Sequence, residues 1–247
     1  MLRALIWDVD GTVAETERDG HRVAFNRAFA EAGLPWAWDL QEYAEWLEVT
    51  GGRERILAYL RRRSDAPAGE AERDALARRL HRRKNAFYAE WVAQGIAARP
   101  GVLRLMDECR AEGVAQAIAT TTSRANVEAL FASLLGAGWQ TRFAAVVCAE
   151  DAPAKKPDPQ AYRLALQRMG VLPHEVFALE DSPNGLRAAR AAGIACGVIR
   201  SAYFAAARFE GAAWLRDDLV APPPVTLALI RSALSSTGGR AAETAAI

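Results

Sequence analysis

Residues 4–13 read Ala-Leu-Ile-Trp-Asp-Val-Asp-Gly-Thr-Val, and this stretch decides the fold of the chain. Its apolar first half predicts a short buried strand at residues 4–7. Two carboxylates, Asp8 and Asp10, follow that strand directly. A carboxylate buried at a strand end costs free energy unless something uses its charge. A divalent cation or a phosphoryl-transfer reaction would use that charge. The alternative is that the two aspartates only make hydrogen bonds in a turn.

After residue 100 the chain alternates between strand and helix patterns. Apolar runs bounded by turn-forming residues predict strands at 114–119, 144–148, 176–179 and 195–199. Helical spacing predicts helices at 102–112, 126–135, 159–169 and 184–192. This alternation predicts the α/β class, with a doubly wound, Rossmann-like parallel sheet that carries helices on both faces.

The segment between the first strand and the alternating region has a helical pattern with weak strand signals. We therefore expect residues 1–15 and 96–220 to form the α/β core and residues 16–95 to form an inserted helical-bundle cap domain. Residues 221–247 are expected to form a C-terminal helix at 225–234 followed by a mobile tail.

Composition bounds the class of protein. The chain has 247 residues, of which 51% are hydrophobic and 25% charged, and its net charge is +1. These values are typical of a globular protein and give no basic field that would attract nucleic acid. The three cysteines are far apart, and the sequence has neither a signal-peptide pattern nor an apolar run that would span a bilayer. We expect a cytoplasmic monomer that binds no membrane and no nucleic acid.

Polar side chains follow four of the predicted strands: Asp8 and Asp10, then residues 120–123, then Lys155 and Lys156, then Glu180 and Asp181. The carboxyl ends of parallel strands meet at one edge of a sheet, so these groups should converge on one crevice. Each group also has a plain explanation, as a helix cap, a solvated loop or a helix N-terminal charge. The coincidence of four groups favours a site.

The chemistry that such a site supports is phosphoryl transfer. Asp8 can attack as a nucleophile and form an aspartyl-phosphate. Asp10 can act as general acid to the leaving oxygen and then as general base to water. Thr120 and Lys156 can hold the phosphoryl oxygens as charge shifts in the transition state.

Magnesium prefers hard oxygen ligands. Asp8, Glu180 and Asp181 would supply them, beside a backbone carbonyl. The sequence therefore predicts Mg²⁺ as the cofactor.

The order of these motifs resembles the haloacid dehalogenase superfamily of phosphatases. The matching residues are Asp8 to Val13, Thr120, Lys156 before Pro157, and Glu180-Asp181. The resemblance implies a Rossmann-like core with a cap that selects the substrate. It also implies that Asp8 is the nucleophile and Asp10 the acid/base, and that Mg²⁺ is bound by Asp8, Glu180, Asp181 and Asp10, the last through its carbonyl.

Four segments, 15–26, 49–56, 119–123 and 180–185, resemble the CbbY-type phosphatases of Calvin-cycle organisms. That family hydrolyses xylulose-1,5-bisphosphate, an inhibitory by-product of Rubisco. The resemblance implies a sugar-phosphate substrate and a place in carbohydrate metabolism. It also adds residues from these segments to the expected substrate-binding set: Thr121, Thr122 and Asn184.

The predicted cap carries a candidate anion site. Thr50, Gly51 and Gly52 precede a helix that starts near Arg53, and glycines at a helix N-terminus expose N–H groups that suit a phosphate. Arg53 and Arg55 add charge and forked donors. The alternative is a glycine turn with solvated arginines. With the family resemblance, binding of a distal phosphate is favoured, although Arg53 stands where many relatives have lysine.

Glu17 and His21 lie four residues apart on the first predicted cap helix, so they should share a face. We expect them to hydrogen-bond sugar hydroxyls. The alternative is a histidine with only a structural role.

Three other functions stay open at this stage. A phosphomutase of the β-phosphoglucomutase type would share the fold and the nucleophile, and the motifs do not separate it from a phosphatase. A non-catalytic sugar-phosphate sensor is opposed by the intact acidic, threonine and lysine motifs. A DNA-associated protein would use the basic runs at 61–63 and 78–84, but acidic residues lie between them and a solvated helix face is favoured.

Overall fold

The computed structural model describes residues 1–244, with side chains described through residue 236. Within this range the chain forms a six-stranded sheet in the order β3-β2-β1-β4-β5-β6, and all neighbouring strands are parallel. The strands are β1 (Ala4–Trp7), β2 (Ala115–Ala119), β3 (Ala145–Val147), β4 (Val176–Glu180), β5 (Ala195–Ile199) and β6 (Trp214–Arg216). The predicted doubly wound α/β fold is confirmed.

The strand β6 was not predicted from the sequence. It is three residues long, lies at the edge of the sheet and is only partly buried, so it lacks the continuous apolar pattern of the other strands. By contrast, every residue of β1 and β4 is fully buried, which is why their apolar runs identified them.

The strand order shows where a ligand crevice is expected at the edge of the sheet. From β1 the sheet grows through β2 and β3 on one side and through β4, β5 and β6 on the other, so the direction of winding reverses between β1 and β4. The carboxyl ends of strands at such a switch point leave a crevice for a ligand. Asp8 directly follows β1 and Glu180 ends β4, so both lie at this point.

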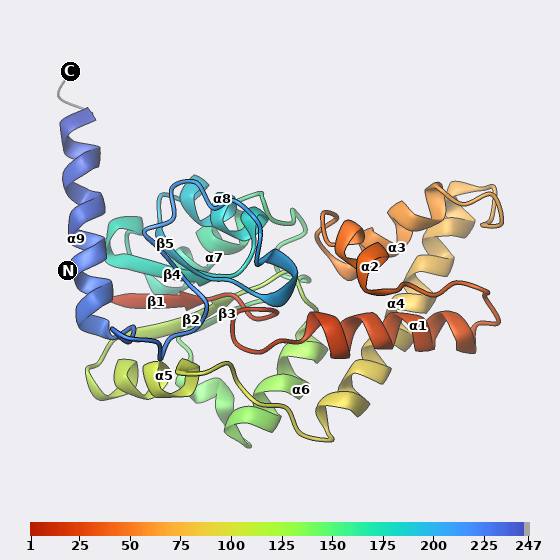
Figure 1. Cartoon of the computed structure of the whole chain (residues 1–247), viewed down its shortest axis with the longest axis horizontal. Coiled ribbons are helices and arrows are strands. Elements are labelled where there is room, and N and C mark those ends of the chain that lie inside the picture. The colour runs from red at the N-terminus through yellow and green to blue at the C-terminus, as the bar shows by residue number, and fades with distance from the viewer. Residues whose placement is uncertain (245–247) are drawn as a thin grey trace. The chain divides into compact units, whose positions relative to one another are not determined.

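Helices cover both faces of the sheet. The helices α7 (Gln160–Met169) and α8 (Pro183–Ala191) pack on one face, and α5 (Val102–Ala111) lies on the other (Figure 1). The last helix, α9 (Leu227–Thr244), packs beside α5, where Arg231 pairs with Glu112 at 2.6 Å. It is longer than the expected helix at 225–234, so most of the expected mobile tail is helical; residues 245–247 lie outside the described residues.

The chain divides into two compact units. The sheet unit consists of Met1–Glu15, Ala97–Thr121 and the chain from Ala137 on, and the helical unit consists of Thr16–Ile96 and Thr122–Gly136. The sequence-based boundaries, 16–95 for the helical domain, did not include the second segment of the helical unit. That segment is the helix α6 (Arg124–Leu135), which packs against α4 (Glu70–Val92).

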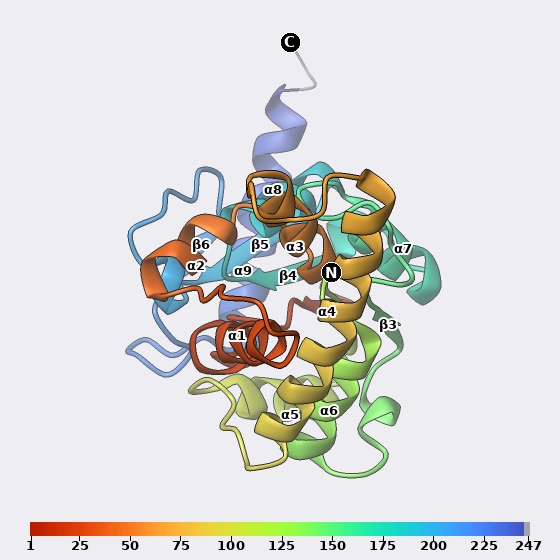
Figure 2. The ribbon, with the colours of Figure 1, turned by 90° about the vertical axis from the view of Figure 1, so that its right-hand side faces the viewer.

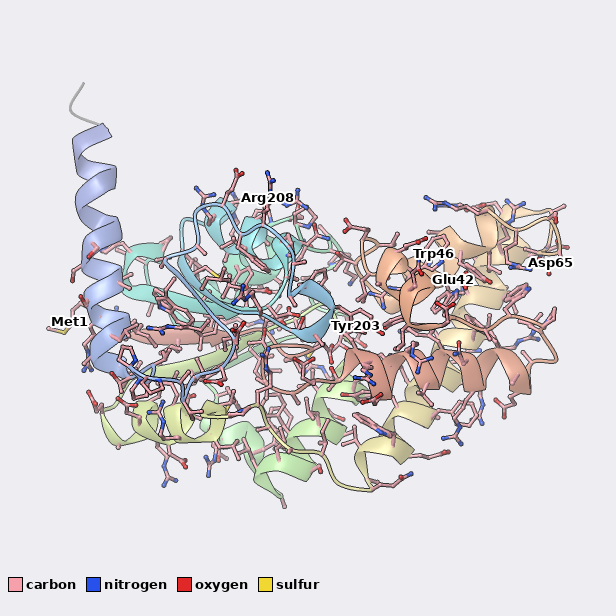
Figure 3. All side chains as sticks on the ribbon, in the orientation of Figure 1. Met1, Glu42, Trp46, Asp65, Tyr203 and Arg208 are labelled. Atoms are coloured by element: carbon pink, nitrogen blue, oxygen red, sulfur yellow. The ribbon has the colours of Figure 1, made fainter. Side chains whose placement is uncertain are left out.

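Within the helical unit, α1 (Arg22–Glu31) and α3 (Gly52–Arg61) both pack against the long helix α4 (Figure 2). Residues of the short helix α2 (Leu40–Trp46) and of the α3–α4 loop are labelled in Figure 3 as Glu42, Trp46 and Asp65. A buried aromatic cluster holds these elements together. Its members are Phe25, Phe29, Trp36, Trp38, Tyr43, Trp46 and Tyr59.

The expectation of one regular helix through Glu17 and His21 was wrong in detail. Residues Glu17–His21 form a π-helical turn, η1, that leads into α1. The carbonyl of Thr16 accepts hydrogen bonds from the N–H groups of both Gly20, at 3.2 Å, and His21, at 2.8 Å, which widens the turn. A Cβ on Gly20 would lie 2.5 Å from the ring of Trp91, so the wide turn depends on glycine at this position.

Four arginines of the two basic runs make ion pairs. Arg61 contacts Glu70, Arg63 contacts Asp65, Arg78 contacts Asp74, and Arg83 contacts Glu31. This pairing accounts for much of the charge that a DNA-binding interpretation would need. Among the described helices, none is both long and apolar enough to cross a membrane.

Candidate active site

Four groups of predicted residues lie at the carboxyl ends of adjacent strands in the sheet unit. Asp8 follows β1, Thr120 follows β2, and Lys156 lies in the segment after β3. Glu180 is the last residue of β4 and Asp181 comes next. The predicted convergence is therefore present, although Glu180 lies inside the strand rather than after it.

Lys156 connects these strand ends. Its Nζ donates to Asp8 Oδ1 at 2.6 Å, to Glu180 Oε1 at 2.6 Å and to the carbonyl of Ala119 at 2.9 Å. The three side chains are buried. Burial opposes the charge of Lys156, but the carboxylates of Asp8 and Glu180 outweigh it and hold the pKa of Lys156 above its usual value. The ammonium therefore stays charged beside Asp8.

The carboxyl group of Asp8 is strongly perturbed. Burial and the nearby carboxylate of Glu180 raise the pKa of Asp8 from 3.8 to about 7, although Lys156 acts in the opposite direction. The ionised form of Asp8 is therefore unfavourable at this buried position even with the lysine present. A cation bound there would favour the ionised form.

The residues that are present fit a divalent cation. Asp8, Glu180 and Asp181 each offer a carboxylate oxygen, and these atoms lie within 4.8 Å of one another. Such hard oxygen donors are the ligands that Mg²⁺ takes in proteins. Gly11 leaves room for this arrangement, because its Cβ would lie 2.0 Å from Asp181 Oδ2.

Glu180 is surrounded by donors that sequence reasoning did not identify. Tyr162, on α7, donates its hydroxyl to Glu180 Oε1 at 2.7 Å. Ser182 Oγ and the N–H of Asp181 lie 3.3 and 3.2 Å from Oε2. Burial and the carboxylate of Glu180 raise the pKa of Tyr162 well above its usual value, so its hydroxyl remains a donor. The sequence signal for Tyr162 was a polar aromatic on the buried face of α7.

The loop that carries Asp10 is fixed by a second residue that the sequence analysis missed. The guanidinium of Arg99 is buried and donates to the carbonyl of Gly11, and it also reaches the carbonyls of Ile199 at 3.0 Å and Asp217 at 2.7 Å. Arg99 thereby ties the loop after β1 to the ends of β5 and β6. In sequence, Arg99 lies just before the predicted helix at 102–112, and nothing there indicates a contact with the loop after β1.

The predicted hydroxyl cluster is divided between the two units. Thr120 is buried at the end of β2 and belongs to the sheet unit with Thr121. Thr122 belongs to the helical unit, where its Oγ1 accepts a hydrogen bond from Asn126 Nδ2 at 3.0 Å. Asn184, in the first turn of α8, contacts the side chain of Arg187.

The candidate anion site of the helical unit has the expected backbone form. Gly51 has φ of +96°, a value that favours glycine, and α3 starts at Gly52, directly after Thr50 and Gly51. Arg53 follows in the first turn, partly exposed, and its Nη2 lies 2.5 Å from Asp74 Oδ1. An incoming phosphate would compete with Asp74 for this guanidinium.

Arg55 differs from Arg53 because it is buried and internally bonded. Its Nε donates to the carbonyl of Trp46 at 3.0 Å, and its Nη1 donates to the hydroxyl of Tyr43 at 2.9 Å. That hydroxyl in turn donates to the carboxylate of Glu17. Arg55 and Tyr43 therefore orient Glu17.

His21 is buried and bonded within the helical unit. Its Nδ1 lies 2.8 Å from Lys84 Nζ, and its ring stacks on Tyr88 with a centroid distance of 4.2 Å. Lys84 is also buried, on α4. This pair was not predicted, because Lys84 lies at the end of a basic run whose pattern favours a solvated helix face, whereas its side chain is buried with those of Phe87 and Tyr88.

Comparisons with known proteins identify the family of the chain. The family model of the haloacid dehalogenase-like hydrolases matches residues 2–193. The plasmid protein CbbY of Cupriavidus necator is 46% identical over 212 residues, which cover 85% of this chain and 83% of that protein. Protein CbbY of Cereibacter sphaeroides is 44% identical and covers 88% of this chain and 93% of its own length.

Solved structures give the same result. A crystal structure of a CbbY variant from Rhodobacter sphaeroides in complex with xylulose-(1,5)-bisphosphate has a TM-score of 0.83 and 42% identity, and the match covers 88% of this chain and 95% of that one. β-Phosphoglucomutase from Clostridium difficile shares the fold, with a TM-score of 0.75 at 18% identity over 96% and 99% of the two chains. The chain belongs to the haloacid dehalogenase-like hydrolases, and its CbbY relatives place it among the phosphatases of that family.

Proposed function

We propose that this phosphatase is magnesium-dependent and hydrolyses a sugar bisphosphate through an aspartyl-phosphate, with xylulose-1,5-bisphosphate as the preferred substrate. The observation that carries the proposal is the buried cluster in which Asp8 contacts Lys156 and lies beside Glu180 and Asp181. The substrate assignment is supported by the bisphosphate bound to the CbbY variant from Rhodobacter sphaeroides.

In the first half of the reaction, a carboxylate oxygen of Asp8 attacks the phosphorus atom. The bond from phosphorus to the sugar oxygen breaks, and Asp10 gives its proton to that oxygen. Lys156 and Thr120 bind the phosphoryl oxygens while charge accumulates on them. The second half reverses the roles: Asp10 takes a proton from water, the water oxygen attacks phosphorus, and phosphate leaves Asp8 free.

Asp8, Glu180 and Asp181, with the backbone carbonyl of Asp10, would hold Mg²⁺. When bound, the ion supplies positive charge that offsets the charge of the phosphoryl group and of the crowded carboxylates. The buried position of Asp8, which raises its pKa to about 7, supports this assignment, because a cation would favour the ionised carboxylate.

The helical unit, on this proposal, is the cap that selects the substrate. Glu17 and His21 bind sugar hydroxyls. Tyr43 orients Glu17, and Lys84 orients His21. The backbone of Thr50, Gly51 and Gly52, together with Arg53, binds the distal phosphate. Arg55 acts through Tyr43 and Glu17. Thr121, Thr122 and Asn184 remain predicted substrate-binding residues, and the cytoplasmic monomer remains a prediction.

The test is release of inorganic phosphate with Mg²⁺ from a panel of esters. The panel contains xylulose-1,5-bisphosphate, ribulose-1,5-bisphosphate, fructose-1,6-bisphosphate, glucose-6-phosphate, β-glucose-1,6-bisphosphate and phosphoglycolate. We expect xylulose-1,5-bisphosphate to have the highest kcat/KM. A different preferred ester would contradict the substrate assignment, and an isomeric sugar monophosphate formed without free phosphate would show a mutase instead.

The anion site makes a separate prediction. Arg53→Met should raise KM for the preferred bisphosphate by about 10- to 100-fold, because a charge-assisted hydrogen bond contributes roughly 1.5–3 kcal/mol. Hydrolysis of p-nitrophenyl phosphate, which has no distal phosphate, should not change. The matched control is Arg78→Met, since Arg78 pairs with the same Asp74 at 2.5 Å. Equal losses on both substrates would show that Arg53 serves folding rather than distal-phosphate binding.

A further inference from the structure

Tyr162 contacts both Lys156, which donates to Asp8, and the carboxylate of Glu180. It is fully buried on α7, and its hydroxyl lies 2.7 Å from Glu180 Oε1. Lys156 Nζ contacts the same oxygen at 2.6 Å and lies 4.9 Å from the centre of the Tyr162 ring. One side chain thus contacts both groups, through its hydroxyl and through its aromatic face.

The contacts of Glu180 show what this arrangement does. Oε1 accepts from Tyr162 and Lys156, whereas the N–H of Asp181 and the hydroxyl of Ser182 approach Oε2. The carboxylate plane is therefore fixed by donors on both sides. Because Asp181 is the neighbouring candidate ligand, the plane of Glu180 also sets how the two carboxylates present oxygens to a cation.

The ring of Tyr162 acts on the second group. The ammonium of Lys156 is buried and bridges Asp8 and Glu180, so its position fixes the separation of these carboxylates. An aromatic face attracts a cation at this distance. The ring thereby favours the position from which Lys156 reaches Asp8.

We propose that Tyr162 is a positioning residue for phosphoryl transfer, whose hydroxyl orients Glu180 for the divalent cation while its ring holds Lys156 beside Asp8. The inference rests on the proposed function, because it assigns a second layer of contacts to the same site. Groups that orient metal ligands through hydrogen bonds typically change metal affinity by about 10- to 100-fold when removed.

The test is Tyr162→Phe, which removes the hydroxyl and keeps the ring. Mg²⁺ is titrated into the substrate-free protein by calorimetry, and the Mg²⁺ concentration for half-maximal phosphate release is measured separately. We expect Mg²⁺ affinity to fall about tenfold and the half-maximal concentration to rise in parallel. Tyr59→Phe is the matched control, since Tyr59 is a buried tyrosine of the helical unit whose hydroxyl accepts from Arg63 at 2.9 Å; it should bind Mg²⁺ as the parent chain does.

A packing role would give a different result. If Tyr162→Phe lowers the melting temperature but leaves Mg²⁺ affinity within twofold of the parent chain, Tyr162 only stabilises the fold and the proposal is overturned. A parent chain that binds no Mg²⁺ would overturn it as well. If the variant weakens Mg²⁺ binding while the parent chain hydrolyses no ester of the panel, the positioning role stands and the proposed function fails.

Discussion

Asp8→Asn is expected to reduce phosphate release by about 10⁴-fold or more, because the substitution removes the attacking carboxylate and leaves only binding and charge stabilisation. Asparagine has nearly the same shape, and its Oδ1 can still accept the hydrogen bond that Lys156 now makes at 2.6 Å. The measurement is a long incubation with the preferred bisphosphate at high protein concentration. Residual activity within about tenfold of the parent chain would mean that another group is the nucleophile.

The same variant should be more stable than the parent chain when both are metal-free at pH 8. In the folded state burial and Glu180 raise the pKa of Asp8 from 3.8 to about 7. A raised carboxyl pKa means that Asp8 contributes stability below the unfolded pKa and loses it as pH rises through the folded pKa. Asparagine carries no charge to bury, so the melting temperature of the Asp8→Asn variant should exceed that of the parent chain at pH 8. The difference should diminish as pH falls from about 7 toward 4.

This pair of results separates lost chemistry from lost folding. An inactive variant with a higher melting temperature has an intact fold, and its defect is the missing nucleophile. A lower melting temperature at pH 8 would contradict the view that the ionised Asp8 is strained in the metal-free cluster. Thermal unfolding in the presence of a chelator, from pH 5 to pH 8, measures this directly.

The central strands and their polar ends were predictable because they depend on local patterns. Residues such as Ile6 and Ala178 lie in unbroken apolar runs, and the acidic groups that follow them stand out in sequence. The edge strand β6 escaped because a three-residue, half-exposed strand has no such pattern. The π-helical turn at Glu17 was not predicted because the local spacing does not distinguish it from an α-helical turn, and the close contact of Trp91 with Gly20 is a tertiary one.

The contacts of the individual polar side chains could not be predicted, since they depend on which of these side chains are buried. Arg53 and Arg55 are two positions apart and are not distinguished by the sequence. Arg53 is partly exposed and pairs with Asp74, whereas Arg55 is buried and donates to a backbone carbonyl. Tyr162 contacts Glu180 across 18 positions of sequence, and Arg99 contacts Gly11 across 88. Contacts of that range follow from the packing of the sheet unit and leave no spacing signal in the chain.

Gly185→Ala is the second substitution for which we expect a very large effect. Gly185 lies in the first turn of α8, and a Cβ there would lie 1.9–2.0 Å from the carboxylate atoms of Glu180. Glu180 has little freedom to move, because Lys156 and Tyr162 hold its Oε1. Alanine favours helix by about 1 kcal/mol over glycine, but overpacking a buried site costs roughly 1–3 kcal/mol.

Displacement of Glu180 should be the cause of the functional defect of Gly185→Ala. We expect Mg²⁺ affinity to fall by about 10- to 100-fold, as for the loss of a group that orients a metal ligand, with a large loss of kcat at fixed Mg²⁺. The matched control is Gly113→Ala. Gly113 has φ of +67° and no atom within 4 Å of its would-be Cβ, so alanine there should lower stability by about 1–2 kcal/mol and leave kcat unchanged.

A double variant tests whether the clash acts through Glu180. Glu180→Asp shortens the side chain by one methylene and draws the carboxylate back from position 185. If the clash is the cause, the losses in Mg²⁺ affinity from Glu180→Asp and Gly185→Ala should combine to less than their product, because the second change then meets a carboxylate that has already withdrawn. Losses that multiply in full would mean that Gly185→Ala acts on α8 itself and not on the metal-binding carboxylate.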